Sequence, residues 1–414
     1  MSTVGLITEY NPFHNGHLHH LQESLRCTGA DASVAVMSGH FLQRGEPALV
    51  DKWVRTEMAL AAGVDLVLEL PFPFACNSAP YFAMGAVRTL NALGVVDTLC
   101  FGSESGEVAP LQEISQLLID RSDAIEEGTR KRLRHGISYP VARAEVLSEL
   151  SPGLSLETMA SPNNILGIEY LRALQTTSSS IQAFTIPRLG AGYHSTDVTG
   201  HIASATGIRK QISEGSKIEH LLPDACREIL KEALDEGKSL DYGRLFTSLQ
   251  TFLLQEVESL NGIYQVENGL EQRLVAAAMT STSYAELTDT IKSRQWTLTR
   301  IQRILSYVLL QISNDEMRDF LQQGPMYLRL LGTTEKGRGV LSRARARRSL
   351  PMISDPARAK ATLRRFYSDR PEFCRLAERM LNCDLRATRL YGLLQVSQQK
   401  VHYNQDFFRA VQRV

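Results

Sequence analysis

The sequence lacks the features that mark membrane proteins and disulfide-bonded proteins. No apolar run approaches the roughly 20 residues that span a bilayer, which excludes a transmembrane helix. Met1–Thr3 leads directly into the strand-like VGLITEY, so we expect no signal peptide. The six cysteines are scattered without a C-x-x-C pair, which argues against a disulfide framework or a zinc knuckle. We therefore expect a cytoplasmic protein with free thiols and no membrane partner.

A net charge is also missing, because 45 basic side chains balance 45 acidic ones among the 414 residues. The balance hides one basic segment, residues 331–370, in which eleven bases against three acids leave a charge of +8. Such a segment can bind nucleic-acid phosphates. Its candidates for that contact are Arg343, Arg345, Arg347 and Arg348. The alternatives are a solvated charged loop and pairing with acids elsewhere in the chain.

Two patterns divide the chain. In the first half, short β-rich runs alternate with helical periodicity, which predicts an α/β fold with a Rossmann-like parallel sheet. The expected strands are residues 4–10, 32–39, 65–71, 98–104 and 181–187. From about Ile218, strand signals largely vanish and long helical periodicities follow. We expect a nucleotide-binding α/β domain at 1–216 and a mainly α-helical domain at 217–414.

The stretch NPFHNGHLHHL, residues 11–21, holds four of the ten histidines. No cysteine lies nearby and H-E-x-x-H is absent, so we expect no metal ligation here. His14 and His17 flank Gly16 where a strand crosses into a helix that begins near Asn15, and helix N-termini attract phosphates. Two imidazoles at this point can donate to phosphate oxygens as charge develops on them. His19 and His20 are expected on a solvated helix face.

These residues carry a resemblance to known enzymes. His14-Asn15-Gly16-His17 resembles the (H/T)-x-G-H motif of the nucleotidylyl transferase superfamily, and IASATGIR at 202–209 resembles its I-S-S-T-x-x-R motif. EYNPFHNGH, MSGHFLQRGEPALVDKW, DLVLELPF, FGSE, SPNNILGIEY and LRLLGTTEKGRGVL are together similar to the bacterial tRNA(Met) cytidine acetate ligase family. Members of that family convert acetate and ATP to acetyl-adenylate and pyrophosphate. They then acetylate the wobble cytidine of elongator tRNA(Met), giving N4-acetylcytidine.

The resemblance implies two catalytic histidines, His14 and His17, and an ATP-binding segment made of Ile7, Thr8, Glu9, Tyr10, Asn11, Pro12, Phe13, His14, Asn15, Gly16, His17, Leu18, His19 and His20. It adds Gly102, Asn163 and Arg188 as nucleotide contacts. Arg209 is a second phosphate candidate, because it lies in the first turns of its expected helix. The arginines of the basic segment become candidate tRNA-binding residues. No acidic metal-ligand motif is evident, so we expect Mg²⁺ to arrive on the ATP phosphates.

Several interpretations stay open at this point. Asn163 could be a simple helix cap. Lys52 and Arg55 could hold acetate or pyrophosphate, or form surface salt bridges, and Cys100 is expected in the core. Two other functions compete: a nucleotidylyl transferase that activates a small carboxylate or cofactor precursor without tRNA, and an RNA-binding protein with an inactive nucleotide site. The oligomeric state and the acyl donor cannot be read from these residues.

Overall fold

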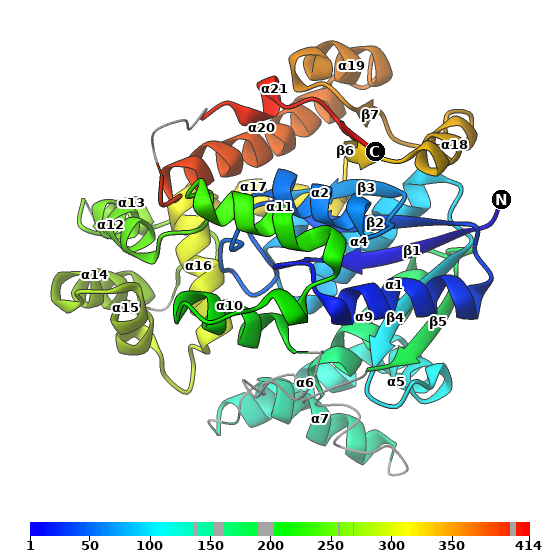
Figure 1. Ribbon diagram of the computed structural model, residues 1–414. Helices are drawn as coiled ribbons and strands as arrows, with labels where there is room; N and C mark the ends of the chain where they lie inside the picture. Colours follow the sequence, from blue (N-terminus) through cyan, green and yellow to red (C-terminus); the bar gives the residue numbers. More distant parts are fainter. Residues whose placement is uncertain are drawn as a thin grey trace.

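The structure of the protein is a computed structural model, shown in Figure 1. It describes residues 1–135, 137, 139–151, 161–188, 203–255, 257–267, 269–397 and 403–414. One sheet runs through the described part of the chain, with helices on both of its faces and a further group of helices beside it (Figure 1). No helix in these ranges is long and apolar enough to cross a membrane.

The sheet has the strand order β5-β4-β1-β2-β3-β6-β7, and β8 pairs with β6. The first five strands are parallel to one another: β1 (Thr3–Thr8), β2 (Ala32–Ser38), β3 (Leu66–Leu70), β4 (Thr98–Ser103) and β5 (Gln182–Pro187). All seven residues of β2 are buried, as expected for a strand covered on both faces. The five expected strands and the parallel arrangement are therefore confirmed.

Helices cover both faces of this sheet. On one face, α1 (Asn15–Thr28), α2 (Lys52–Ala61) and α11 (Asp224–Asp235) pack their apolar residues against β1 and β2. On the other face lie α4 (Ala79–Leu93), α5 (Val108–Asp120) and α9 (Pro162–Thr176). Residues next to the helix ends determine where two of these helices begin or end. Asp51 caps the start of α2 by accepting two backbone N–H groups, and α1 ends at Gly29, whose backbone is in the left-handed region. The six cysteines are free thiols, and Cys100 is buried as expected.

The remaining helices lie around this unit. In the first half they are α3 (Phe72–Ala75), α6 (Ser122–Leu133), α7 (Tyr139–Leu150) and α10 (Ala205–Ser213). The second half adds η1 (Glu219–Leu221), α12 (Tyr242–Leu253), α13 (Val257–Leu260), α14 (Leu270–Thr280), α15 (Tyr284–Ile291), α16 (Leu298–Leu310), α17 (Asn314–Gln323), α18 (Glu335–Ala344), η2 (Pro356–Arg358), α19 (Ala359–Phe366), α20 (Pro371–Leu393) and α21 (Gln405–Phe408). Helices α12 and α14–α16 share a core of their own, which Phe41 and Phe72 of the first half enter.

The second half also contributes strands, which the sequence did not indicate. β6 (Leu328–Thr333) pairs antiparallel with β3, and β7 (Met352–Ile353) and β8 (Gln412–Arg413) pair with β6. A short, mainly apolar segment such as LRLLGT cannot be distinguished from a buried helical turn by its periodicity, so the strand with which it pairs decides its structure. The sheet therefore crosses the expected boundary between residues 216 and 217. The division into two domains stays a prediction about folding units.

Candidate active site

A cavity opens at the carboxyl ends of β1, β4 and β5, where ligands of open α/β sheets bind. Most of the residues proposed for ATP line it: Ile7, Thr8, Glu9, Tyr10, Asn11, His14, Gly16, His17, His19, His20, Gly102, Asn163, Arg188 and Arg209. Four do not. Pro12 and Phe13 are buried, Leu18 packs against the core, and Asn15 donates to the carbonyl of His220 at 3.0 Å. These four residues give the segment its shape rather than line the cavity.

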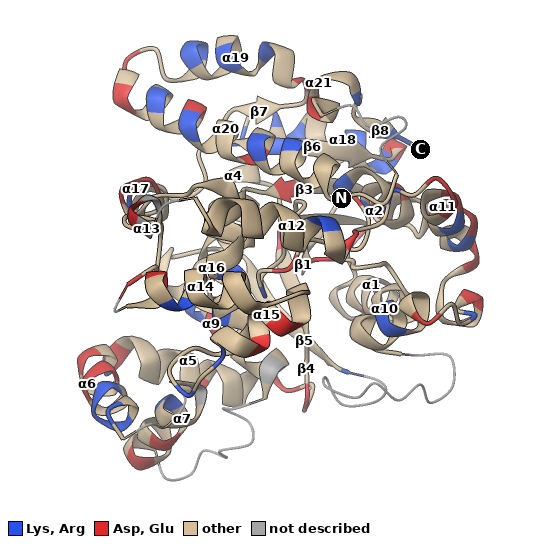
Figure 2. Ribbon diagram, turned by 90° about the vertical axis from the view of Figure 1, so that its left-hand side faces the viewer, with Lys and Arg blue, Asp and Glu red and all other residues tan. Residues whose placement is uncertain are grey.

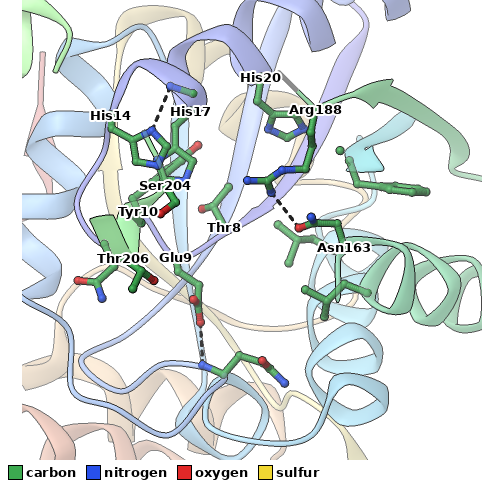
Figure 3. A pocket seen from close by; sticks show the side chains of 18 of the residues that line it. Thr8, Glu9, Tyr10, His14, His17, His20, Asn163, Arg188, Ser204 and Thr206 are labelled. Carbon is green, nitrogen blue, oxygen red and sulfur yellow. Dashed lines mark hydrogen bonds between the residues drawn. The ribbon is translucent and has the colours of Figure 1, made fainter. Parts of the chain in front are cut away.

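His14 and His17 lie together at the start of α1 (Figure 3). Their ring centroids are 3.9 Å apart. His14 caps the helix, because its Nδ1 accepts the Gly16 N–H at 3.0 Å. That bond leaves the proton of the neutral ring on Nε2. The cap therefore prepares His14 to donate into the cavity.

Burial favours the uncharged form of both imidazoles. It lowers the pKa of His14 to about 3, with the cations of Arg188 and Arg209 acting in the same direction. Burial also lowers the pKa of His17 well below its usual value, and His14 and His20 add to the effect. A neutral imidazole donor such as the Nε2–H of His14 stabilises a phosphate more as the negative charge on that phosphate grows. The predicted phosphate role for this pair thus fits its geometry.

On the opposite side of the cavity, Arg188 is held by a short chain of hydrogen bonds (Figure 3). Its Nη1 donates to Asn163 Oδ1 at 2.9 Å, and Asn163 Nδ2 donates to Glu104 Oε1 at 2.9 Å. Ser161, not Asn163, is the N-cap of α9, so the simple cap interpretation of Asn163 is wrong. A Cβ at Gly102 would lie 3.1 Å from Arg188 Cγ, so this glycine gives the arginine its room.

His20 also belongs to the cavity wall, contrary to the expectation of a solvated helix face. Its ring faces Arg188 (Figure 3), and its Nε2 is buried without a hydrogen-bond partner in the described chain. Burial, followed by Arg188, lowers its pKa to about 4. His19 lines the cavity as well. The expectation of a solvated helix face is therefore wrong for His20, because its side of α1 faces the cavity, whereas His19 stays partly exposed.

The second motif meets the first at this cavity, except for Ile202, which lies outside the described residues. Ser204 caps α10 by accepting the Gly207 N–H at 3.0 Å. Arg209 Nη1 donates to the carbonyl of Asn11 at 3.0 Å, and its Nη2 lies 3.9 Å from Glu46. Two helix N-termini, those of α1 and α10, thus face one cavity together with the Arg188 and Arg209 guanidinium groups. The arrangement suits a polyphosphate.

Lys52 and Arg55 serve neither of the roles expected for them. Lys52 is fully buried, and its Nζ lies 2.8 Å from Glu69 and 2.9 Å from Asp406. Arg55 is fully buried and donates to the carbonyls of Glu9, Ser38 and Gly39. Neither side chain lines the cavity. Both interpretations, a substrate contact and a surface salt bridge, are wrong because the partners come from distant parts of the chain.

The four arginines of the basic segment lie near the amino ends of the parallel strands, at the opposite end of the strands from the cavity. Helix α18 begins where the backbone N–H of Thr334 donates to the carbonyl of Asp65, just before β3, so α18 lies at the amino ends of the parallel strands (Figure 1). Further along the chain, α19 and α20 also carry Lys and Arg residues (Figure 2). Arg343 contacts Met1 and Thr3 at the start of β1. Arg345, Arg347 and Arg348 follow the helix, and the first two are exposed. None of the four lines the cavity.

The cavity also has lining residues that the sequence did not single out for binding. Phe82, Leu166 and Tyr170 come from α4 and α9, which read as ordinary core helices. Ser204 and Thr206 belong to the second motif, so that motif could have indicated them. Arg44 and Glu46 come from the loop after β2, where Gln302 of α16 donates to Glu46 at 2.6 Å. Residues 217–414, called the helical half, therefore hold one wall of the cavity in place.

A known family model matches nearly the whole chain. The family model described as HIGH Nucleotidyl Transferase matches residues 1–406. Together with the parallel sheet and the paired histidines at the start of α1, this match shows that the chain is a member of the HIGH nucleotidyl transferase family.

Individual relatives place the chain within a smaller group of this family. A protein of Syntrophotalea carbinolica named tRNA(Met) cytidine acetate ligase is 52% identical over 413 residues, covering 99% of this chain and 98% of the relative. One of the same name from Acetivibrio thermocellus is 42% identical, covering 85% and 88%. The crystal structure of Thermotoga maritima TmcAL bound with alpha-thio ATP superposes with a TM-score of 0.91 at 33% identity, with full coverage of both chains. The chain belongs to the tRNA(Met) cytidine acetate ligase family.

Proposed function

We propose that the protein activates acetate with ATP to acetyl-adenylate and pyrophosphate. It then transfers the acetyl group to the wobble cytidine of elongator tRNA(Met), forming N4-acetylcytidine. The observation that carries the first step is the pair His14 and His17 at the N-terminus of α1, opposite the N-terminus of α10 and Arg209. The names of the relatives, at up to 52% identity over nearly the whole chain, support acetate and tRNA(Met) as the substrates.

In the first step, an acetate oxygen attacks the α-phosphorus of ATP and pyrophosphate leaves. The reaction needs no covalent intermediate with the enzyme, so positioning and charge neutralisation must supply the rate. We assign the α-phosphate to the histidine pair and the leaving pyrophosphate to Arg209 and the start of α10. The nucleoside then lies toward Gly102, Asn163 and Arg188, where Phe101 and Tyr170 offer apolar surface.

Mg²⁺ would reach this site on the phosphates of ATP. Among the described residues, no group of three or more His, Cys, Asp or Glu side chains is placed to hold a metal ion. Mg²⁺ commonly binds through substrate phosphates and keeps several waters, which fits a site rich in cationic and neutral donors. The ion would add positive charge on the transferring phosphate. His14 and His17 would orient that phosphate through their ring N–H groups.

The tRNA would approach from the wall that the helical half orders, which is why we assign tRNA binding chiefly to residues 217–414. The basic segment at the amino edge of the sheet is too far around the molecule to touch the acceptor base. Its exposed arginines would contact phosphates elsewhere on the tRNA, with an affinity that falls with salt. A cytoplasmic location and an action on tRNA belong to the same proposal.

Acetate-dependent exchange of labelled pyrophosphate into ATP tests the first step. We expect exchange in the wild-type protein and a loss of about 100-fold or more in His17→Ala, since a donor to the reacting phosphate contributes this much. The exposed Glu57→Gln on α2 is the matched control. Labelled acetate should then appear as N4-acetylcytidine in digests of elongator tRNA(Met). Exchange without any tRNA product would favour activation of a carboxylate for another acceptor. No exchange at all would contradict the proposal.

A further inference from the structure

The adenylation step proposed above gives no role to one carboxylate of the cavity, Glu9. Glu9 follows β1 directly and is half-buried in the cavity wall. Its Oε1 accepts the backbone N–H of Gln43 at 2.7 Å, and its side chain points away from the histidine pair toward that residue (Figure 3). A second anion beside a triphosphate would weaken ATP binding rather than support it. The position of Glu9 therefore needs another explanation.

Glu9 differs from Glu46, the other acid among the described residues that line this cavity. Glu46 is engaged by Gln302 at 2.6 Å and lies 3.9 Å from Arg209. Glu9 Oε2, in contrast, has no hydrogen-bond partner within the described part of the chain. Burial raises the pKa of the Glu9 carboxyl, although the Gln43 N–H and the cations of Arg209, Arg44 and Arg55 oppose the effect. A carboxylate with a free oxygen and a raised pKa is a competent proton acceptor.

The helical half fixes the surroundings of this carboxylate. Ser306 Oγ of α16 donates to the carbonyl of Gly45 at 2.6 Å, which anchors the loop that carries Gln43. Gln43 Nε2 also donates to the carbonyl of Asn77 at 3.0 Å. Glu9 is therefore held rigidly at the side of the cavity where the loop after β2 meets the helical half. This is the side from which we expect the acceptor base to enter.

The two steps of the proposed reaction differ in their need for a base. Acetate is already a carboxylate, so its attack on the α-phosphorus releases no proton. The exocyclic amine of cytosine must lose one when it is acylated. His14 is a poor acceptor for that proton because burial lowers its pKa to about 3. A base is thus required on the acceptor side of the cavity.

We propose that Glu9 is the catalytic base of acetyl transfer, an inference that rests on the proposed function. The N4 nitrogen of the cytosine attacks the acetyl carbonyl carbon, forming the amide bond. The bond between that carbon and the bridging oxygen breaks, and AMP leaves with the electron pair. Glu9 Oε2 takes the proton from N4 and later passes it to solvent.

Glu9→Gln separates this role from a structural one. The glutamine keeps an oxygen that can accept the Gln43 N–H but cannot take a proton. We expect acetate-dependent pyrophosphate exchange within about tenfold of wild type. Single-turnover transfer from preformed acetyl-adenylate to tRNA should fall by about 10²–10⁴, the usual contribution of a general base. Glu57→Gln, exposed on α2, should change neither rate.

The pH dependence supplies a readout that a structural role would not affect. The rate of acetyl transfer by the wild-type protein should rise from acid pH to a plateau as Glu9 ionises. Glu9→Gln should lack this acid limb, the increase of rate with pH. Glu9→Asp should keep the limb at a reduced rate. Equal losses of exchange and transfer in Glu9→Gln, or transfer at the wild-type rate, would overturn the assignment. Absence of exchange in the wild-type protein would instead reject the proposed function itself, so the two failures are distinguishable.

Discussion

Lys52→Met would remove a buried cation that two carboxylates share, while the long apolar side chain fills most of the same space. The carboxylates are Glu69 on β3 and Asp406 on α21, at 2.8 and 2.9 Å from Nζ. Asp406 keeps a second cation, because Arg329 of β6 lies 3.2 Å from it. The substitution therefore leaves Glu69 as the group without a countercharge. It also loosens the contact between the C-terminal segment and the sheet.

Breaking a buried ion pair by removing one partner costs about 3–5 kcal/mol. Since Arg329 still neutralises Asp406, we expect a loss near the lower end, about 3 kcal/mol in the free energy of unfolding. Equilibrium urea unfolding followed by circular dichroism would measure it. Glu69→Gln added to Lys52→Met should restore part of the loss, by about 0.5–3 kcal/mol, because it removes the unpaired charge.

The difference in the free energy of unfolding between wild type and Lys52→Met should depend on pH in a direction that the pKa of Asp406 determines. Burial raises the pKa of Asp406, but Lys52 and Arg329 outweigh it and hold the pKa below its usual value. A lowered pKa stabilises the folded state above the unfolded pKa of about 3.9, and this stabilisation is lost as the pH falls. The difference in the free energy of unfolding between wild type and Lys52→Met should therefore become smaller below about pH 4. A loss under about 1 kcal/mol at neutral pH, or a raised KM for acetate with unchanged stability, would refute the structural role.

Two further predictions concern the site and the basic segment. Burial holds the pKa of His14 at about 3 and that of His17 well below its usual value, so the pH profile of kcat/KM for ATP should show no histidine ionisation near pH 6.5. A change of rate near that pH that disappears in His14→Asn would contradict this. The double variant Arg345→Ala, Arg347→Ala should leave pyrophosphate exchange intact and raise the KM for tRNA. The slope of log affinity for tRNA against log salt concentration should fall by about one unit per arginine. An unchanged KM and slope would instead assign these arginines to a solvated face.

Many local features could be predicted from the sequence because they depend on neighbours in the chain. The start of α1 near Asn15, its end at Gly29 and the cap of α2 by Asp51 each involve groups within a few residues of one another. The same holds for the phosphate-binding character of His14 and His17, which follows from a histidine pair at a strand-to-helix crossover. Periodicity is a local property, and these are the features that it can indicate.

The parallel α/β unit, the role of the histidine pair and the family of the chain could all be predicted from the amino-acid sequence. The contacts between side chains that are distant in the sequence could not be predicted and became visible in the folded protein. The tertiary structure turned Lys52 inward onto Asp406, took His20 from the solvent to the cavity wall, and placed the basic segment at the amino ends of the parallel strands. It also made a strand of LRLLGT by pairing it with β3. Local patterns cannot predict these contacts, because the burial of a side chain and the pairing of a strand depend on residues far away in the sequence.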